Sequence, residues 1–187
     1  VRPPIANVDQ AILVFSAVEP DFSTGLLDRF LVLVESKEIA PVICISKVDL
    51  LDTSGLSRIE VYAEHYRKIG YEVVLTSSIE ETGITDLMPF ISGKTSVFAG
   101  QSGVGKSSLL NALDPELNLK TSEISSHLGR GKHTTRHVEL ISIGDGLIAD
   151  TPGFSSLEFT ELEAVELSDC FPEMRENSSE CKFRGCM

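Results

Sequence analysis

The amino-acid sequence predicts an α/β fold built on a mainly parallel β-sheet. Short apolar runs alternate with amphipathic stretches along the first hundred residues, which is the pattern of strands connected by helices. A glycine-rich turn then joins the fourth apolar run to a further helical pattern. With 187 residues, the chain is long enough to form one domain with a small appendage, and it needs no disulfide framework.

Each expected element follows from its own pattern. Four apolar runs bounded by polar residues are expected to form strands, at 11–15, 42–45, 72–75 and 96–99. Three stretches with apolar residues at helical spacing are expected to form helices, at 23–36, 56–69 and 85–91. The segments 137–143 and 147–150 flank Gly144-Asp145-Gly146, which predicts an antiparallel hairpin.

The other segments are less regular. The stretch 116–136 has little periodicity and is expected to be a long functional loop. After Phe154 we expect a helix followed by a weakly ordered end, with Pro172 breaking any helix there. Cys44 falls inside an apolar strand pattern, which fits a reduced core thiol better than a disulfide.

The charge of the chain limits its partners. Lys and Arg number 16 and Asp and Glu 28, so the net charge is −12. An acidic surface repels phosphate backbones, and contact with RNA would need a local basic patch. The apolar runs are too short to cross a membrane and no signal-peptide pattern is present, so we expect a cytoplasmic protein with no membrane partner.

The strongest motif is a phosphate-binding loop that follows a predicted strand and opens a helix. Its glycines allow backbone N–H groups to wrap an anion, and the helix N-terminus favours negative charge. Lys106 would reach the β- and γ-phosphates, and Ser107 would ligate Mg²⁺. The alternative is a glycine-rich turn without a ligand. The predicted nucleotide-binding residues are Gly100, Gln101, Ser102, Gly103, Val104, Gly105, Lys106, Ser107 and Ser108. The loop alone indicates a nucleoside triphosphatase or kinase and does not choose the base.

A second motif would choose the base. Ser46-Lys47-Val48-Asp49 follows a buried strand, and the Asp49 carboxylate could accept two hydrogen bonds from guanine, an arrangement that adenine lacks. The Lys47 stem could cover the base or ribose. Ser77 and Ser78 follow the next strand, where a backbone N–H could reach guanine O6. Taken alone, a surface Lys and a helix-capping Asp are equally good interpretations.

A third motif, Asp150-Thr151-Pro152-Gly153, ends the second strand of the hairpin. Asp150 would hold Mg²⁺ through water, and the Gly153 N–H could sense the γ-phosphate. The alternative is a Pro-Gly turn with an Asp cap.

These motifs resemble those of translation-factor-related GTPases, but their order is different. The base-reading elements Lys47–Asp49 and Ser77-Ser78 come first, and the phosphate loop and Asp150–Gly153 follow. That order is a circular permutation, which a fold tolerates when its termini lie close together. With the segment Gly129–Arg136 (GRGKHTTR), it resembles the RsgA (YjeQ/EngC) family of small-subunit-dependent GTPases, which act late in 30S ribosome assembly. The family's Asn at the start of the base motif is Ser46 here.

The resemblance also implies a domain organisation. A circularly permuted GTPase domain is expected over 1–157, and the start of a C-terminal zinc-binding region over 158–187, while the family's N-terminal OB-fold is absent from this chain. Cys181 and Cys186 match the first two zinc ligands of that region. Two ligands cannot close a tetrahedral site, so zinc is expected only in the full-length protein.

The resemblance implies catalytic residues and partners as well. Phe154 stands where related enzymes carry a water-orienting Gln, and the family instead uses a histidine that corresponds to His133. Thr135, or Thr134 if the register differs by one, would close over Mg²⁺ and the γ-phosphate. A basic loop is expected to contact ribosomal RNA of the 30S subunit, through Arg130, Lys132 and Arg136.

The sequence therefore predicts a monomeric GTPase that converts GTP to GDP and phosphate, stimulated by the small ribosomal subunit. Two alternatives remain at this point. One is a P-loop ATPase or kinase, and the other is a nucleotide-gated binding module whose hydrolysis is incidental.

Overall fold

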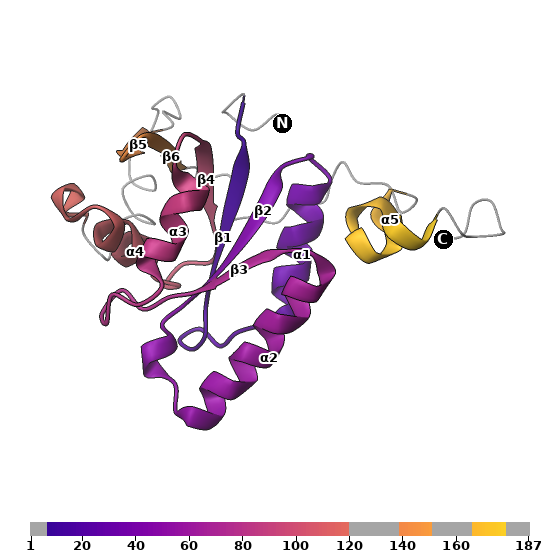
Figure 1. Ribbon diagram of the computed structural model, residues 1–187, viewed down its shortest axis with the longest axis horizontal. Helices are drawn as coiled ribbons and strands as arrows, with labels where there is room; N and C mark the ends of the chain where they lie inside the picture. The colour runs from indigo at the N-terminus through magenta and orange to yellow at the C-terminus, as the bar shows by residue number, and fades with distance from the viewer. Residues whose placement is uncertain (1–6, 120–138, 151–165, 179–187) are drawn as a thin grey trace, which may run out of the picture.

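The computed structural model describes residues 7–119, 139–150 and 166–178 (Figure 1). In these residues one six-stranded sheet has the order β3-β2-β1-β4-β6-β5. All neighbouring strands are parallel except β5, which pairs antiparallel with β6. The strands are β1 (Gln10–Ser16), β2 (Ala40–Ser46), β3 (Glu72–Leu75), β4 (Thr95–Ala99), β5 (Glu139–Ile143) and β6 (Gly146–Asp150).

Helices cover both faces of this sheet (Figure 1). Apolar residues of α1 and α2 pack on one face and those of α3 and α4 on the other. Within β1, Leu13 and Phe15 face the first layer while Ile12 and Val14 face the second. A strand buried on both faces must be apolar throughout, which explains the unbroken apolar run. The helices are α1 (Thr24–Glu35), α2 (Thr53–Ile69), α3 (Ile84–Ile91), α4 (Lys106–Leu113) and α5 (Pro172–Ser178).

The predicted strands, the first three helices and the hairpin are confirmed, with ends that differ by at most three residues. The largest difference is at α2, where the Asp52 carboxylate accepts a hydrogen bond from the Gly55 N–H at 2.7 Å and starts the helix earlier. The prediction for Pro172 was wrong, because this proline is the first residue of α5. Proline fits that position, since the first N–H of a helix has no intrahelical partner.

The prediction of a reduced core thiol at Cys44 is also confirmed. Cys44 is fully buried and free, and its Sγ lies 3.4 Å from Thr76 Oγ1. Burial raises the pKa of the Cys44 thiol to about 12, so the thiol stays protonated at neutral pH. Among the described helices, none has the length and apolar character that a membrane span requires.

Five strands, namely β1, β2, β3, β4 and β6, end on the same side of the sheet, which we call the carboxyl edge. From β1 the chain proceeds to β2 and β3 on one side, and it returns to β4 on the other side of β1. Ligands of open α/β sheets bind at the carboxyl ends of strands where the order reverses in this way. The loop that follows β4 is the predicted phosphate loop, so the fold places it at this position.

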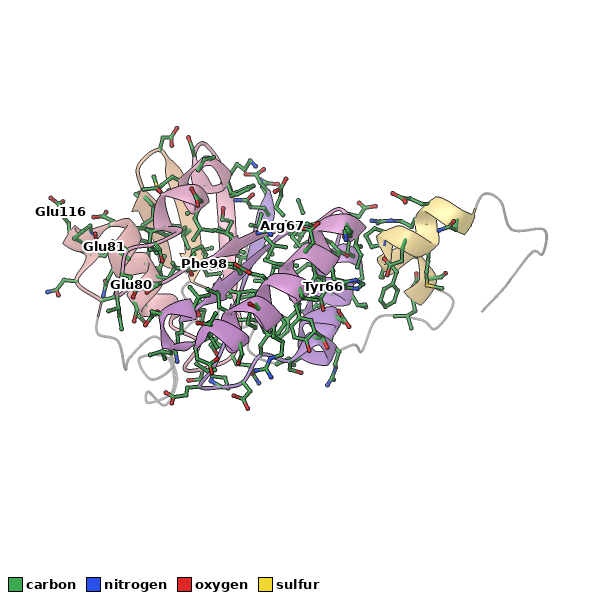
Figure 2. The ribbon with its side chains drawn as sticks, turned by 60° about the horizontal axis from the view of Figure 1, so that its bottom comes forward. Tyr66, Arg67, Glu80, Glu81, Phe98 and Glu116 are labelled. Atoms are coloured by element: carbon green, nitrogen blue, oxygen red, sulfur yellow. The ribbon has the colours of Figure 1, made fainter. Side chains whose placement is uncertain are left out.

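The helical layer, which we define as α1, α2, α5 and the short helical turn Leu167–Cys170, lies on the other side from α3 and α4 (Figure 1). Arg175 of α5 forms an ion pair with Glu35 at the end of α1, with 2.9 Å between Nη1 and Oε2. Figure 2 shows Tyr66 and Arg67 in this layer, away from Glu80, Glu81 and Glu116. The predicted boundary at residue 157 lies outside the described residues.

Candidate nucleotide-binding site

The predicted phosphate loop connects β4 to α4 in the strand–turn–helix arrangement that its motif requires. A side chain at Gly100 would place its Cβ only 2.1 Å from the Val14 carbonyl oxygen, so only glycine lets the chain leave β4 beside β1. Gly105 has φ +92°, a left-handed conformation that favours glycine, and caps α4. Val104 between them is buried in the core and anchors the loop. The exposed residues of the loop are Gln101, Ser102 and Gly103.

Lys106 is the first residue of α4, and its ammonium folds back over the loop. Nζ donates hydrogen bonds to the carbonyl oxygens of Gly100 and Gln101, each at 2.7 Å. Its positive charge is therefore held against the loop that would receive the phosphates. The next residue, Ser107, lies in the first turn of α4 and is buried, and Ser108 is half-buried.

The predicted base-reading segment lies against this loop, although the two are more than fifty residues apart in the sequence. The Ser46 hydroxyl donates to the Val104 carbonyl oxygen at 2.5 Å and also lies 3.2 Å from the Phe15 carbonyl oxygen. A Cβ on Gly105 would lie 3.9 Å from both Lys47 Cε and Ser46 Oγ. Ser46 therefore joins the end of β2 directly to the phosphate loop.

Asp49 lies in the short helical turn Val48–Leu50 that follows Lys47, and it is half-buried. Lys47 has φ +60°, and this left-handed residue turns the chain out of β2. The N–H of Val48 donates to the Thr76 carbonyl oxygen at 3.3 Å, which joins this turn to the segment after β3.

In that segment, Ser77 is fully buried, and its Oγ accepts a hydrogen bond from the Glu80 N–H at 3.0 Å. Ser78 is half-buried. The structure thus brings three of the predicted segments together: the phosphate loop, residues 46–49 and residues 76–78. The Ser77 hydroxyl is used within its own turn, and the N–H groups of Thr76 and Ser77 donate to the carbonyl oxygens of Ile45 and Thr82.

Sequence reasoning missed that hydroxyls close three adjacent strands. Ser16 at the end of β1, Ser46 at the end of β2 and Thr76 just after β3 are all buried. Ser16 and Ser46 each donate to a loop carbonyl, and Thr76 pairs with Cys44. The available signal was a hydroxyl residue directly after each of these three apolar runs.

Asp150 is the remaining predicted site residue within the described ranges. The backbone of Asp150 ends β6, and because Val97 pairs with Ala149 this end lies beside β4, the strand that leads into the phosphate loop. No group of three or more His, Cys, Asp or Glu in the described ranges is arranged to hold a metal ion. The predicted residues that lie outside the described ranges are Arg130, Lys132, His133, Thr134, Thr135, Arg136, Gly153, Cys181 and Cys186.

Comparison with known proteins gives the family. The sequence model of the RsgA GTPase family matches residues 1–160. The chain belongs to the RsgA GTPase family. It is 66% identical to the small ribosomal subunit biogenesis GTPase RsgA of Bacillus subtilis (strain 168), covering 100% of this chain and 63% of that protein. The corresponding protein of Bacillus pumilus is 68% identical, with the same two coverages. The chain thus spans less than two thirds of these RsgA relatives.

Solved structures agree with the RsgA assignment. The crystal structure of YloQ, a circularly permuted GTPase, has a TM-score of 0.80 and 58% identity, covering 99% of this chain and 58% of YloQ. YjeQ from Thermotoga maritima has a TM-score of 0.82 and 38% identity, covering 100% of this chain and 62% of that protein. The predicted α/β fold with circularly permuted motifs is confirmed.

Proposed function

We propose that this chain binds GTP, hydrolyses it to GDP and phosphate, and acts in late biogenesis of the small ribosomal subunit. The observation that carries the proposal is the hydrogen bond from the Ser46 hydroxyl, at the end of β2, to the Val104 carbonyl oxygen of the phosphate loop. A segment suited to reading guanine and a segment suited to binding phosphates then belong to one site. Family membership and the RsgA relatives support the ribosomal role.

The described residues account for nucleotide binding in this proposal. Lys106 and the loop amides would neutralise the negative charge of the phosphates. Preorganised donors in a partly closed site stabilise such charge better than water does. The Asp49 carboxylate would accept hydrogen bonds from guanine, and backbone groups near Ser77 and Ser78 would complete the base site.

Mg²⁺ fits the oxygen donors that the motifs supply, since it prefers hydroxyl, carboxylate and phosphate oxygens. Ser107, Asp150 and Thr135 (or Thr134) would hold it. Bound Mg²⁺ supplies charge neutralisation at the β- and γ-phosphates. Cys181 and Cys186 would join further ligands in a zinc site only in the full-length protein.

Hydrolysis also needs a group that orients the attacking water. Phe154 has no donor or acceptor for this task, so His133 is proposed to perform it, with Gly153 sensing the γ-phosphate. We expect His133→Ala to lower GTP turnover by about 10²–10⁴-fold, the range for loss of an acid–base or positioning group. Binding of GDP, measured by calorimetry, should change little. A variant that turned over GTP like the wild type would remove His133 from the mechanism.

The basic residues Arg130, Lys132 and Arg136 are proposed to contact rRNA of the small subunit, in an otherwise acidic chain. A cytoplasmic location follows from that partner. Turnover of GTP should rise when purified 30S subunits are added, because contact with the RNA would position His133 at the attacking water. If the 30S subunit gave no stimulation to the full-length protein, GTP hydrolysis would stand without the ribosomal role.

The choice of guanine is tested at Asp49. Asp49→Asn should weaken GDP binding by roughly 100-fold or more and increase binding of xanthosine diphosphate, because the exchanged donor and acceptor match xanthine. Asp52→Asn is the matched control, since Asp52 lies three residues further on, caps α2 and can be replaced by an equally good capping residue. The control should keep the wild-type preference. Unchanged GDP binding in Asp49→Asn would favour the ATPase or kinase alternative.

A further inference from the structure

The loop that joins β1 to α1 lies at the carboxyl edge of the sheet. It covers residues 17–22 between β1 and α1, and it lies beside Lys47. The Lys47 ammonium donates a hydrogen bond to the carbonyl oxygen of Glu19. The same side chain passes the phosphate loop, because its Cε lies 3.9 Å from the position of a Cβ on Gly105. Lys47 therefore runs from beside the phosphate loop to the 17–22 loop.

The 17–22 loop is fixed at both ends. At its start, the buried Ser16 hydroxyl donates to the Pro20 carbonyl oxygen at 2.6 Å, and the Ala17 N–H donates to the Ser46 carbonyl oxygen at 2.8 Å. At its end, the Phe22 ring packs against Phe15 and Tyr62, with centroid distances of 6.4 and 5.6 Å. These contacts hold the Glu19 carbonyl at a defined place.

The backbone on both sides of this contact is unusual. Glu19 has φ +53° and Lys47 has φ +60°, the left-handed region that residues with side chains rarely adopt. Such conformations persist where the surrounding contacts impose them, and they concentrate at functional sites. Two left-handed residues joined by a hydrogen bond are therefore a feature that the fold maintains against a local cost.

We propose that the 17–22 loop borders the nucleotide site, together with the phosphate loop and residues 46–49. We also propose that Ser16 is a positioning residue for Lys47. The inference rests on the proposed binding of guanine nucleotides. The Glu19 carbonyl holds the Lys47 ammonium, so that the stem of the lysine stays over the base and ribose. Ser16 does not touch the nucleotide. It acts by fixing Pro20, and through it the neighbouring Glu19 carbonyl.

The test measures release of GDP that carries a fluorescent N-methylanthraniloyl group on its ribose. We expect Ser16→Ala to accelerate dissociation about threefold to tenfold, the effect of losing one hydrogen bond. Lys47→Ala should itself release GDP faster, and in that background Ser16→Ala should give no further acceleration. A merely structural role of Ser16 would accelerate release to the same extent in both backgrounds, and that outcome would overturn the proposal.

Ser36→Ala is the matched control, because Ser36 also donates to a backbone carbonyl, that of Leu33 at 2.8 Å, but lies at the other end of α1. It should release GDP like the wild type. If Ser16→Ala does not fold, Ser16→Cys offers a weaker donor of similar size and should accelerate release by a smaller factor. Wild-type rates in both Ser16 variants would contradict the proposal. A wild-type chain that bound no guanine nucleotide would instead refute the proposed function.

Discussion

At the carboxyl edge of the sheet, polar side chains bond to the carbonyl groups of loops, whereas in the helical layer they join one secondary-structure element to another. Ser46, Lys47 and Lys106 all donate to loop carbonyls. In the helical layer, the Tyr66 hydroxyl of α2 donates to Asp28 of α1 at 2.7 Å, and Arg175 of α5 pairs with Glu35 of α1. Contacts of the first kind set the shape of loops that a ligand can reach. Contacts of the second kind stabilise the packing of the helices.

This difference leads to an expectation about mutations. Substitutions at the carboxyl edge should change nucleotide binding more than stability, and substitutions in the helical layer should do the reverse. Nucleotide binding or turnover is therefore the informative measurement at the carboxyl edge, and the free energy of unfolding is the informative one in the helical layer.

The largest effect is expected at Lys106. Lys106→Ala removes the positive charge held over the phosphate loop, and GTP turnover should fall about 100-fold to 1,000-fold, as for loss of a preorganised charge-stabilising group. Lys94→Ala is the matched control, because Lys94 lies just before β4, at the other end of the strand from the loop, and its Nζ is 3.4 Å from Gln10 Oε1. Turnover by the control should match the wild type. Equal losses of turnover in the two variants would mean that Lys106 has no specific role in stabilising the phosphates.

A smaller effect is expected at Ser46, which joins the base segment to the phosphate loop. Ser46→Ala leaves the Val104 carbonyl without this donor, and GDP affinity measured by calorimetry should fall about threefold to tenfold. Ser92→Ala also removes a hydroxyl contact, to the Asp145 carboxylate at 3.1 Å, away from the carboxyl edge. It should leave the affinity unchanged. The proposed coupling of the two segments would fail if Ser46→Ala bound GDP as tightly as the wild type.

The smallest effect on binding, and a clear effect on stability, is expected at Tyr66. Tyr66→Phe removes the hydrogen bond to Asp28 and should lower the free energy of unfolding by about 1 kcal/mol in denaturant titrations at pH 7. Burial and the neighbouring Asp28 carboxylate raise the pKa of the Tyr66 hydroxyl above its ordinary value of 10.0. GDP affinity should stay at the wild-type value.

The raised pKa of Tyr66 gives this prediction a pH dependence. A group with a raised pKa in the folded state contributes stability below its unfolded pKa and loses it at higher pH. Wild-type stability should therefore decrease above pH 10.0, and its advantage over Tyr66→Phe should shrink there. An advantage that stayed constant above that pH would contradict the assignment of this bond.

The fold was predictable where apolar residues follow the regular spacing of a strand or a helix. The apolar runs of the strands and the spacing of the first three helices located those elements. The position of Pro172 was misjudged because a proline that would interrupt a helix interior is favourable at its first residue.

The candidate site was predictable as motifs but not as contacts. From the sequence, Ser46 is only a departure from the Asn of the family. The structure shows that its hydroxyl donates a hydrogen bond to the Val104 carbonyl oxygen. The bond of Ser16 to Pro20 was missed because it depends on how the 17–22 loop folds back. A hydroxyl at the end of an apolar strand is a sequence signal, but its partner is set by the tertiary structure.

In the proposed function, segments distant in the sequence form one pocket for a guanine nucleotide. Hydrogen–deuterium exchange of this chain with and without GDP tests whether they do. GDP should slow exchange together in residues 17–22, 46–50, 76–78 and 100–107, and leave 166–178 unchanged. Slower exchange confined to 100–107 would mean that the phosphate loop binds its ligand alone, and it would contradict a shared pocket.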